Sequence, residues 1–577
     1  MAFGLTGYST MSWPTGAHRR TTRELEGNNL KSYLRKLKNP RSALVVCLVL
    51  AAGMDTAAAH QDDVAVPGEF GPPGKMSALH EKQHARFFAD RIPTQDLDAL
   101  SAVSCASGFA GIYPCDNVDL LAFLPLNMIG GGQGNDIWGW TDPVSGADYA
   151  IMGRTNGTSF VDISDPENPV YVGNLPGHNG STSSWRDIKV YSNHAYIVSE
   201  SNGHGLQVFD LNQLRAVVSP PVTFSETAHY GNFGDAHNIA INEATGFGYA
   251  LGSNTCAGGL HMVDLQNPAA PVFAGCYSGD GYTHDAQCVI FSGADPVYVG
   301  REICFNSNED TLTIVDVSDK GSPALISRTT YPGVGYVHQG WLTEDHGQFL
   351  LDDELDEVLF GHNTRTRIFD LSDLTAPLLI GSKDGATSSI DHNLYIVGER
   401  TYEANYRSGL SVFDSGDAAS GVLDEVGFFD VFPLNDSPAF NGAWSVFPFF
   451  ASGVVVVSGI EQGLFVLAPG TLGLGATDPG SAGSINQWTL SGATPNGLVG
   501  LVTGRMAGST PLSVPSCPGL SVDIANARIA ALETAGIDGR GNFSRNIPLI
   551  LRGQTLRFQA VDPGTCSVSN TVVTTMQ

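Results

Sequence analysis

The chain has 577 residues and a formal net charge of −28, and only 15% of its residues are charged. So acidic a protein is expected to avoid nucleic acid and anionic membranes, whereas cations and basic partners are compatible with it. The 68 glycines and the low share of charged residues are typical of an all-β protein with many tight turns.

The N-terminus has the pattern of an export signal over residues 1–59. A basic stretch at 31–41 precedes a short apolar run at 42–53, and three alanines at 57–59 form a small-residue cleavage site before His60. The run is too short to cross a bilayer as an ordinary helix. We therefore expect an extracellular or cell-surface protein, with the periplasm as another destination, and no transmembrane span in the mature chain.

Residues 60–117 form a predicted N-terminal extension, polar and weakly patterned. It contains Pro-Gly-rich sequence and one candidate short helix at 76–92.

A hydrophobic segment that ends in aspartate recurs from there on. The copies end at Asp162, Asp210, Asp264, Asp316, Asp370 and Asp414, about 44–54 residues apart, and a degenerate copy follows at 463–467. This period is typical of propeller blades with four antiparallel strands each. We predict an all-β, seven-bladed β-propeller over residues 118–468.

One repeat shows the expected blade in detail, with strands at 185–190, 195–199, 205–210 and 221–226. The last repeat has no sequence for a fourth strand. A surplus strand at 118–124 precedes the first blade, so we expect it to complete the last blade and remove an exposed sheet edge.

Two further segments follow the repeats. Residues 469–484 are rich in Gly, Pro and Ser and are predicted to be a linker. Residues 485–577 hold short alternating runs separated by turn signals, which favours a small β-sandwich.

Nine cysteines minus Cys47 of the signal leave eight, an even number in an exported protein. Proximity and the blade pattern favour four local disulfides over metal thiolates, because no Cys-x-x-Cys cluster is present. The predicted pairs are Cys105–Cys115, Cys256–Cys276, Cys288–Cys304 and Cys517–Cys566.

The first strand of each blade lines the channel, so residues at the starts of these strands should converge. The candidate ligand-binding residues at these positions are Asp136, Arg186, Asp187, His237, His284, Asp285, His338, His392 and Trp444. The loops after the second strands are expected to add carboxylates on the same face. The predicted residues are Glu200, Glu302, Glu354, Glu403 and Glu461.

Neutral imidazole and carboxylate are the usual ligands of divalent transition metals, and the same groups serve general acid–base catalysis. The candidate metal ligands are His237, His284, His338, His392, Glu302 and Glu354. An alternative stays open, in which these polar residues only bond neighbouring blades. The sequence shows no His-x-x-x-His pair and no Gly-x-Ser-x-Gly elbow, so no catalytic residue is assigned.

The acidic run at 352–357 (Asp-Asp-Glu-Leu-Asp-Glu) is a candidate calcium site, because carboxylates are ligands for this cation. It lacks the spacing of an EF-hand loop, and a solvated acidic loop is the alternative. The expected cofactor is therefore either absent or a divalent metal, calcium or a transition metal.

The repeat copies, best seen at 312–316 (Leu-Thr-Ile-Val-Asp), resemble the bacterial LVIVD repeat. Longer stretches are similar to the choice-of-anchor B family, among them NVDLLAFLPL (117–126), DIWGWTDPVSG (136–146), GREICFNSNEDT (300–311) and FLLDDELDE (349–357). The resemblance covers residues 105–468 and implies an exported, surface-associated protein with a variable C-terminal anchor. It implies no catalytic residues, and residues 485–577 stand where the anchor is expected.

These observations favour a binding or scaffold module whose ligand is an unidentified protein, glycan or small molecule. The alternative is a metal-dependent hydrolase or lyase at the channel mouth.

Overall fold

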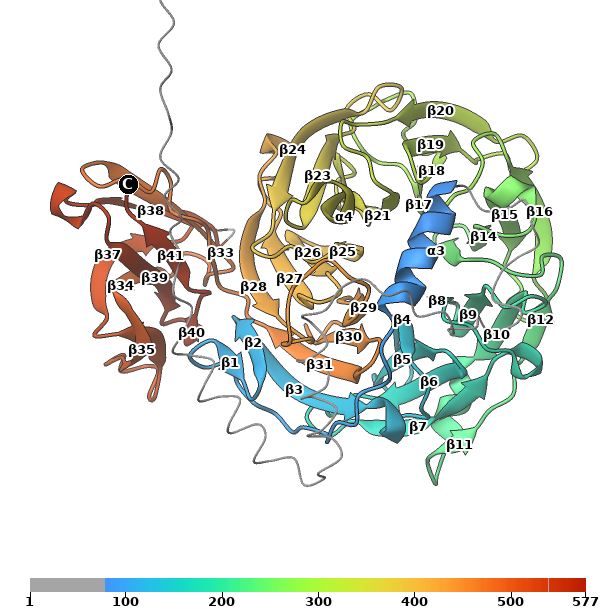
Figure 1. The fold of residues 1–577 in the computed structure, drawn as a ribbon, viewed down its shortest axis with the longest axis horizontal. Helices are drawn as coiled ribbons and strands as arrows, with labels where there is room; N and C mark the ends of the chain where they lie inside the picture. The colour runs from blue at the N-terminus through green and yellow to red at the C-terminus, as the bar shows by residue number, and fades with distance from the viewer. Residues whose placement is uncertain (1–77, 538) are drawn as a thin grey trace, which may run out of the picture. The chain divides into compact units, whose positions relative to one another are not determined.

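The computed structural model describes residues 78–577 except residue 538 (Figure 1). The predicted signal peptide at 1–59 and the first part of the extension, at 60–77, lie outside the described residues. The described chain is all-β with many antiparallel sheets, as predicted. The candidate short helix is confirmed as α3 (Ala78–Asp90).

Successive four-stranded antiparallel units lie around a common centre, which α3 crosses in Figure 1. The first three sheets contain β4 (Gly134–Thr141), β5 (Asp148–Arg154), β6 (Gly157–Asp162) and β7 (Val170–Pro176); β8 (Arg186–Tyr191), β9 (His194–Ser199), β10 (Leu206–Asp210) and β12 (Ala228–Tyr230); and β13 (Asn238–Asn242), β14 (Phe247–Leu251), β15 (Leu260–Asp264) and β16 (Val272–Tyr277).

The next three sheets follow the same order along the chain. They contain β17 (Asp285–Ile290), β18 (Glu302–Ser307), β19 (Leu312–Asp316) and β20 (Ala324–Thr329); β21 (Val337–Leu342), β22 (Gln348–Asp353), β23 (Arg365–Asp370) and β24 (Leu378–Asp384); and β25 (Asn393–Val397), β26 (Arg400–Ala404), β27 (Leu410–Asp414) and β28 (Asp424–Phe429). A short helix, α4 (Asp356–Phe360), lies between β22 and β23.

The recurring aspartates end the third strand of six sheets, and hydrogen bonds explain why. In each case a side-chain oxygen accepts from the backbone N–H two residues later, at 2.9–3.0 Å, as for Asp162 and Ser164 or Asp316 and Ser318. Such an Asx turn lets the aspartate terminate the strand. The residues before it are buried, because each sheet packs between two others.

One predicted strand, at 221–226, is wrong. β12 is the fourth strand of its sheet, with Leu206 opposite Tyr230. The short β11 (Val222–Thr223) instead pairs in parallel with β7 of the preceding sheet. The connection between β10 and β12 is long enough for β11 to pair with β7 before the chain returns to its own sheet.

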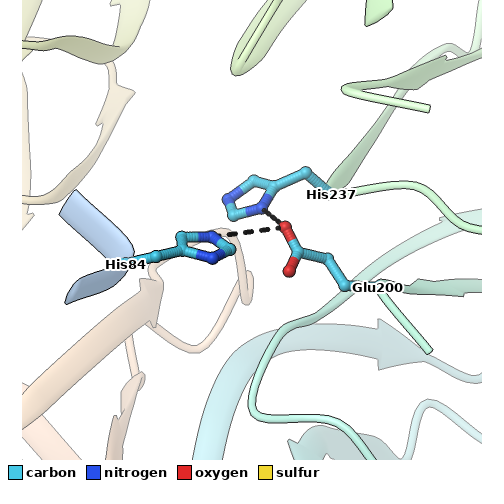
Figure 2. Close-up of side chains that lie close together, drawn as sticks. All are labelled: His84, Glu200 and His237. Carbon is cyan, nitrogen blue, oxygen red and sulfur yellow. Dashed lines mark hydrogen bonds and ion pairs between the residues drawn. The ribbon is translucent and has the colours of Figure 1, made fainter. Parts of the chain in front are cut away.

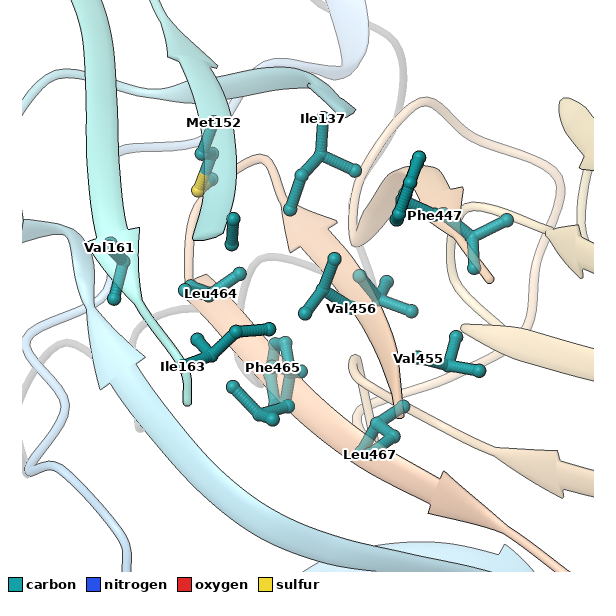
Figure 3. Close-up of a cluster of buried hydrophobic side chains, with 14 of the residues drawn as sticks. Ile137, Met152, Val161, Ile163, Phe447, Val455, Val456, Leu464, Phe465 and Leu467 are labelled. Carbon is teal, nitrogen blue, oxygen red and sulfur yellow. The ribbon is translucent and has the colours of Figure 1, made fainter. Parts of the chain in front are cut away.

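The strand predicted at 118–124 does join the last repeat. β3 (Val118–Pro125) pairs antiparallel with β31 (Gly463–Pro469), beside β30 (Val455–Gly459) and β29 (Ala443–Phe447). Figure 3 shows the apolar contact where this sheet meets the first one, with Leu464 of β31 near Met152 and Val161, and Phe465 beside Ile163. Buried aliphatic and aromatic side chains thus hold the two ends of the repeat region together.

All four predicted disulfides are present, namely Cys105–Cys115, Cys256–Cys276, Cys288–Cys304 and Cys517–Cys566. The first closes a hairpin of β1 (Phe109–Ala110) and β2 (Tyr113–Asp116), which extends the sheet of β28. Disulfides are typical of an oxidising, exported environment.

The C-terminal residues form separate sheets around their own core. The strands are β32 (Gly473–Leu474), β33 (Ile485–Ser491), β34 (Leu498–Gly504), β35 (Met506–Pro511), β36 (Ser521–Ala525), β37 (Arg528–Thr534), β38 (Gly541–Asn546), β39 (Thr555–Asp562), β40 (Ser567–Val568) and β41 (Val572–Thr575). The segment predicted as a linker contributes β32, and its Leu472 and Leu474 are buried in this core. It is therefore part of the packed structure.

In the part of the chain that the structure describes, no helix combines the length and the apolar character needed to cross a bilayer.

Candidate functional site

The centre of the sheet ring is covered by α3, which is held there by aromatic packing. The buried Phe87 lies 4.9 Å from Trp185 and 5.7 Å from Trp444, measured between ring centroids. The imidazole of His84 stacks on Trp185 with centroids 4.1 Å apart. Because α3 and the strand starts bury one another, the polar residues at the centre are removed from water.

Four of the predicted channel residues form a continuous arc of imidazoles at this centre. Ring centroids of His237 and His284 lie 4.2 Å apart, those of His284 and His338 4.1 Å, and those of His338 and His392 4.3 Å. All four side chains are buried. The sequence pattern brought them together because each lies at the start of the first strand of a successive sheet, three just before it and His338 as its second residue.

Hydrogen bonds from the ring nitrogens to backbone carbonyl oxygens orient three of these rings. Nδ1 of His284 donates to the carbonyl oxygen of His338 (2.8 Å), Nδ1 of His338 to that of His392 (3.3 Å), and Nδ1 of His392 to that of Trp444. A carbonyl oxygen only accepts hydrogen bonds, so Nδ1 carries the hydrogen and Nε2 carries the lone pair of the neutral ring. Each ring thus both bonds the neighbouring sheet and presents a ligand nitrogen.

Two of these nitrogens meet the carboxylate of Glu354. Its Oε1 lies 3.7 Å from Nε2 of His338 and 3.4 Å from Nε2 of His392. Tyr406 donates its hydroxyl hydrogen to Oε1 (2.7 Å), and Gln83 of α3 donates to Oε2 (2.8 Å). Burial raises the pKa of Glu354 to about 8 and lowers the pKa of His392 to about 3, so the imidazole is neutral at pH 7.

A second group of the same composition includes a residue of α3. Figure 2 shows Nε2 of His84 at 3.6 Å and Nδ1 of His237 at 2.6 Å from Oε1 of Glu200. We use the term hub for the two groups together with His284. Two histidines and one carboxylate are a ligand set shared by catalytic zinc sites and non-haem iron sites.

The predicted aspartates lie in a different part of the centre, around Lys189. Its Nζ is 2.7 Å from Oδ1 of Asp187 and 3.9 Å from Oδ2 of Asp136, and it lies over the ring of Trp138. Oδ2 of Asp136 accepts from the N–H of Ile188 in the next sheet. Here the structural alternative describes the contacts best, because the carboxylates bond neighbouring sheets and a lysine balances their charge.

The remaining predicted residues have other surroundings. Arg186 forms hydrogen bonds with His204 and with the carbonyl oxygen of Ser181, neither of which belongs to the hub. Asp285 has its pKa raised to about 7 by burial, against the opposing field of Lys189. Trp444 packs on both His392 and Phe87, so it joins the hub to α3.

Glu302 is not brought together with the histidines. It begins β18, so it lies at the start of a second strand, whereas the expectation placed it in the loop after one. Its carboxylate binds Lys320 at 2.7 Å and accepts from Tyr249 at 2.5 Å. The loop after β18 carries Glu309 instead, which is buried and bridges by its backbone to Val337.

The acidic run at 352–357 is not a solvated loop. All five carboxylates of the run are buried, and α4 begins within it at Asp356. Asp352 lies with Asp391 and Glu403 rather than with the histidines. Glu461, the last predicted loop carboxylate, accepts from Asn441 and Gly442, and burial raises its pKa to about 7.

Two hub residues were missed at the sequence level, His84 and Gln83, both on α3. The available signal was a histidine on a predicted helix with an apolar partner, Phe87, three residues later. Nothing in the local pattern showed that this helix would cross the ring.

Comparisons with known proteins fit the repeat reading. The model of the LVIVD repeat matches residues 132–175 and 304–330, and the first match spans almost all of the sheet β4–β7. No curated protein matches the chain. The chain is similar to a functionally unknown protein from Desulfotomaculum acetoxidans (11% identity, TM-score 0.38), with 54% of this chain and 95% of that one covered.

Two further solved structures show similarity of the same order. A protein from Lactobacillus plantarum has 12% identity and a TM-score of 0.38, with 71% of this chain and 99% of that one covered. PorZ, a surface component of the type-IX secretion system of Porphyromonas gingivalis, has 10% identity and a TM-score of 0.42, with 80% and 64% covered. The chain thus carries LVIVD repeats within an all-β fold.

Proposed function

We propose that this protein is an exported, surface-associated binding module: a seven-bladed β-propeller of the choice-of-anchor B type, closed by β3, with a C-terminal β-module in the anchor's place. Its ligand is a divalent transition-metal ion, bound at the hub by His338, His392 and Glu354. The LVIVD matches, the successive four-stranded sheets and the pairing of β3 with β31 support the propeller.

The spacing of the three ligand atoms carries the metal proposal. Around a tetrahedral zinc ion with bonds of about 2.0–2.2 Å, neighbouring ligand atoms are separated by roughly 3.3–3.6 Å. The nitrogens of His392 and His338 lie 3.4 and 3.7 Å from Oε1 of Glu354. Small side-chain adjustments are enough to reach that geometry.

Contacts around the ligands support the same reading. Metal-binding histidines generally donate their other ring N–H to a carbonyl or carboxylate, which fixes the tautomer. His338 and His392 do so to backbone carbonyls, and Glu354 is held by Tyr406 and Gln83. A purely structural hydrogen-bond role requires the Nδ1 contacts but not the convergence of both Nε2 atoms on one carboxylate.

Binding is favoured over the alternative of a hydrolase or lyase, because a substrate would have to reach buried imidazoles. His338, His392 and Glu354 are each at most 3% exposed. α3 contributes Gln83 to the metal site's surroundings and covers the mouth with Phe87. An ion fits this enclosure, whereas an organic substrate requires α3 to leave.

The test is metal analysis of protein purified without a histidine tag. We expect about one equivalent of zinc-class metal, a higher melting temperature with added Zn²⁺ or Co²⁺, and visible Co²⁺ absorption of a tetrahedral site. His392→Ala and Glu354→Gln should lose both signals, whereas His194→Ala, on the hairpin between β8 and β9, should keep them. Less than a tenth of an equivalent, with no thermal shift, contradicts the proposal.

Export is tested separately. Protein recovered outside the cytoplasm should begin at His60, which N-terminal sequencing measures directly. An N-terminus upstream of residue 42 on the exported protein contradicts the predicted cleavage.

A further inference from the structure

A second, independent set of possible ligands lies between two neighbouring sheets, away from the histidines. Asp352 is near the end of β22, Asp391 precedes β25, and Glu403 lies in β26, so the two sheets β21–β24 and β25–β28 both contribute. We call these three residues the acidic cluster. Their side chains are each 0% exposed, and one oxygen from each lies within 4.8 Å of the others.

The hydrogen bonds of the acidic cluster leave several buried oxygens without a partner. No N–H or hydroxyl group donates to either carboxyl oxygen of Asp352 or to Oδ2 of Asp391, and Asp352 has only the carboxyl group of Glu403 within hydrogen-bond reach. Oδ1 of Asp391 accepts from the N–H of Asp353 at 3.2 Å, and Glu403 accepts from the hydroxyl of Thr366 at 3.0 and 3.1 Å. Buried polar atoms are satisfied in most native structures, so these exceptions indicate a missing partner.

The adjacent turn of α4 adds two more buried carboxylates. Both oxygens of Glu357 and Oδ1 of Asp356 also lack hydrogen-bond partners. The nearby cations are already engaged by Asp356: Arg367 donates to its Oδ2, and Nε2 of His362 lies 3.4 Å from the same oxygen. Among the described residues, no lysine, arginine or histidine forms an ion pair with Asp352, Asp391 or Glu403.

Buried carboxylates must either hold protons or neutralise a cation, because isolated charges are costly in a dry interior. Carboxylate oxygens select hard cations, and Ca²⁺ binds them at about 2.3–2.6 Å, so oxygens on opposite sides of its shell are roughly 4.6–5.2 Å apart. The three oxygens of the acidic cluster, all within 4.8 Å of one another, are close enough together to share one such ion. Mg²⁺ usually keeps several waters, which a fully buried site disfavours.

We propose that Asp352, Asp391 and Glu403, with Glu357 beside them, bind a Ca²⁺ ion that ties the sheet β21–β24 to the sheet β25–β28. The site is separate from the hub and does not depend on the function proposed above. The sequence indicated calcium at 352–357, but the ligands from Asp391 and Glu403 come from the next sheet.

The experiment compares full-length protein in EGTA with protein in millimolar CaCl₂. Calcium at about a hundredfold excess over its dissociation constant should raise the melting temperature by about 3–6 °C. Tb³⁺ should bind with sensitised luminescence that Ca²⁺ competes away. Zn²⁺ analysis of the hub is unaffected by either result.

Two near-isosteric variants, Asp352→Asn and Glu403→Gln, separate a cation site from shared protons. Both should lose the calcium-induced shift and the Tb³⁺ signal, while melting in EGTA at or above the wild-type temperature, because an uncompensated carboxylate has been removed. The exposed Glu167→Gln is the matched control and should keep the full response. Wild-type protein with no calcium shift and no competed Tb³⁺ signal overturns the proposal, as does an unchanged calcium response in both variants.

Discussion

Two groups of buried carboxylates in the same ring of sheets differ in their counter-ion. Asp136 and Asp187 share the ammonium of Lys189, and Oδ2 of each accepts a backbone N–H group of the next sheet. The acidic cluster of Asp352, Asp391 and Glu403 accepts hydrogen bonds from the hydroxyl of Thr366 and the backbone N–H of Asp353. Similar residue types therefore have different roles, and the decisive observation is whether the fold supplies a cation.

The pKa values follow this division only in part. The field of Lys189 contributes to holding the pKa of Asp187 below its ordinary value despite burial. Asp136 lies farther from the lysine, and burial together with the charge of Asp187 raises its pKa well above the ordinary value. Burial and the neighbouring Glu403 likewise raise the pKa of Asp352. A carboxyl group in direct contact with the lysine stays ionised, whereas one among other carboxyls holds a proton until a cation replaces it.

The largest expected effect comes from removing the lysine. Lys189→Met leaves two buried carboxylates without their cation and should lower the free energy of unfolding by about 3–5 kcal/mol. Urea unfolding followed by tryptophan fluorescence measures this loss. The triple variant Asp136→Asn/Asp187→Asn/Lys189→Met should recover part of it, and Lys82→Met, exposed on α3, should have little effect. A loss below about 1 kcal/mol for Lys189→Met means that the lysine does not stabilise this group.

The pH dependence of metal-free protein gives an effect of intermediate size. Burial raises the pKa of Glu354 to about 8 and those of Asp116 and Asp430 to about 7. Between pH 4.5 and 8 the folded state binds more protons than the unfolded state, so stability falls as pH rises. Below pH 6.5 the depressed pKa of His392, about 3, acts in the opposite direction, because the unfolded chain then takes up the proton.

The raised carboxyls outnumber the opposing histidine, so we expect the melting temperature in chelator to be highest near pH 5 and to decline towards pH 8. Glu354→Gln should flatten the alkaline limb, because it removes a buried carboxyl group whose pKa is raised to about 8. A melting temperature that rises steadily from pH 6 to 8 in both proteins contradicts this assignment.

The smallest effect should come from an exposed charge pair of the same sheet. Arg365 donates two hydrogen bonds to Asp384, at 2.6 and 2.9 Å, but the two side chains are 31% and 50% exposed. Arg365→Ala should lower the free energy of unfolding by about 0.2–1 kcal/mol. The same urea titration applies, and a loss above about 2 kcal/mol shows that exposure does not separate weak from strong pairs in this protein.

Much of the fold follows from the sequence because its signal is local. Each repeat copy that ends in aspartate ends a third strand, because the aspartate accepts a hydrogen bond from the backbone N–H two residues later. This contact depends only on neighbouring residues in the sequence. Three disulfides were also predictable because their cysteines lie 10–20 residues apart, whereas Cys517 and Cys566, 49 residues apart, are the two cysteines of the C-terminal segment. The fourth strand of the second sheet was not, because the choice between β11 and β12 depends on contact with a neighbouring sheet.

The site was predicted in part for the same reason. Four of the hub histidines, His237, His284, His338 and His392, occupy the same position in successive repeats. Aligning the repeats was therefore enough to predict that they lie together. Glu302 was misplaced because residues 297–300 have the apolar pattern of a strand, while the second strand begins only at Glu302. His84 and the pairing of Asp352 with Glu403 depend on tertiary contacts that no single-repeat pattern contains.

The pairing of β3 with β31 has a consequence for the order of folding. β3 ends at Pro125, but its partner begins only at Gly463, after all the intervening sheets. During synthesis from the N-terminus, the apolar side chains of Leu120, Phe123 and Leu124 lack their partner strand until more than 300 further residues have been made. Ring closure is then the last step, and a long-range one that loop-closure entropy makes slow. Until it occurs, β3 is the open edge at which a second nascent chain can pair.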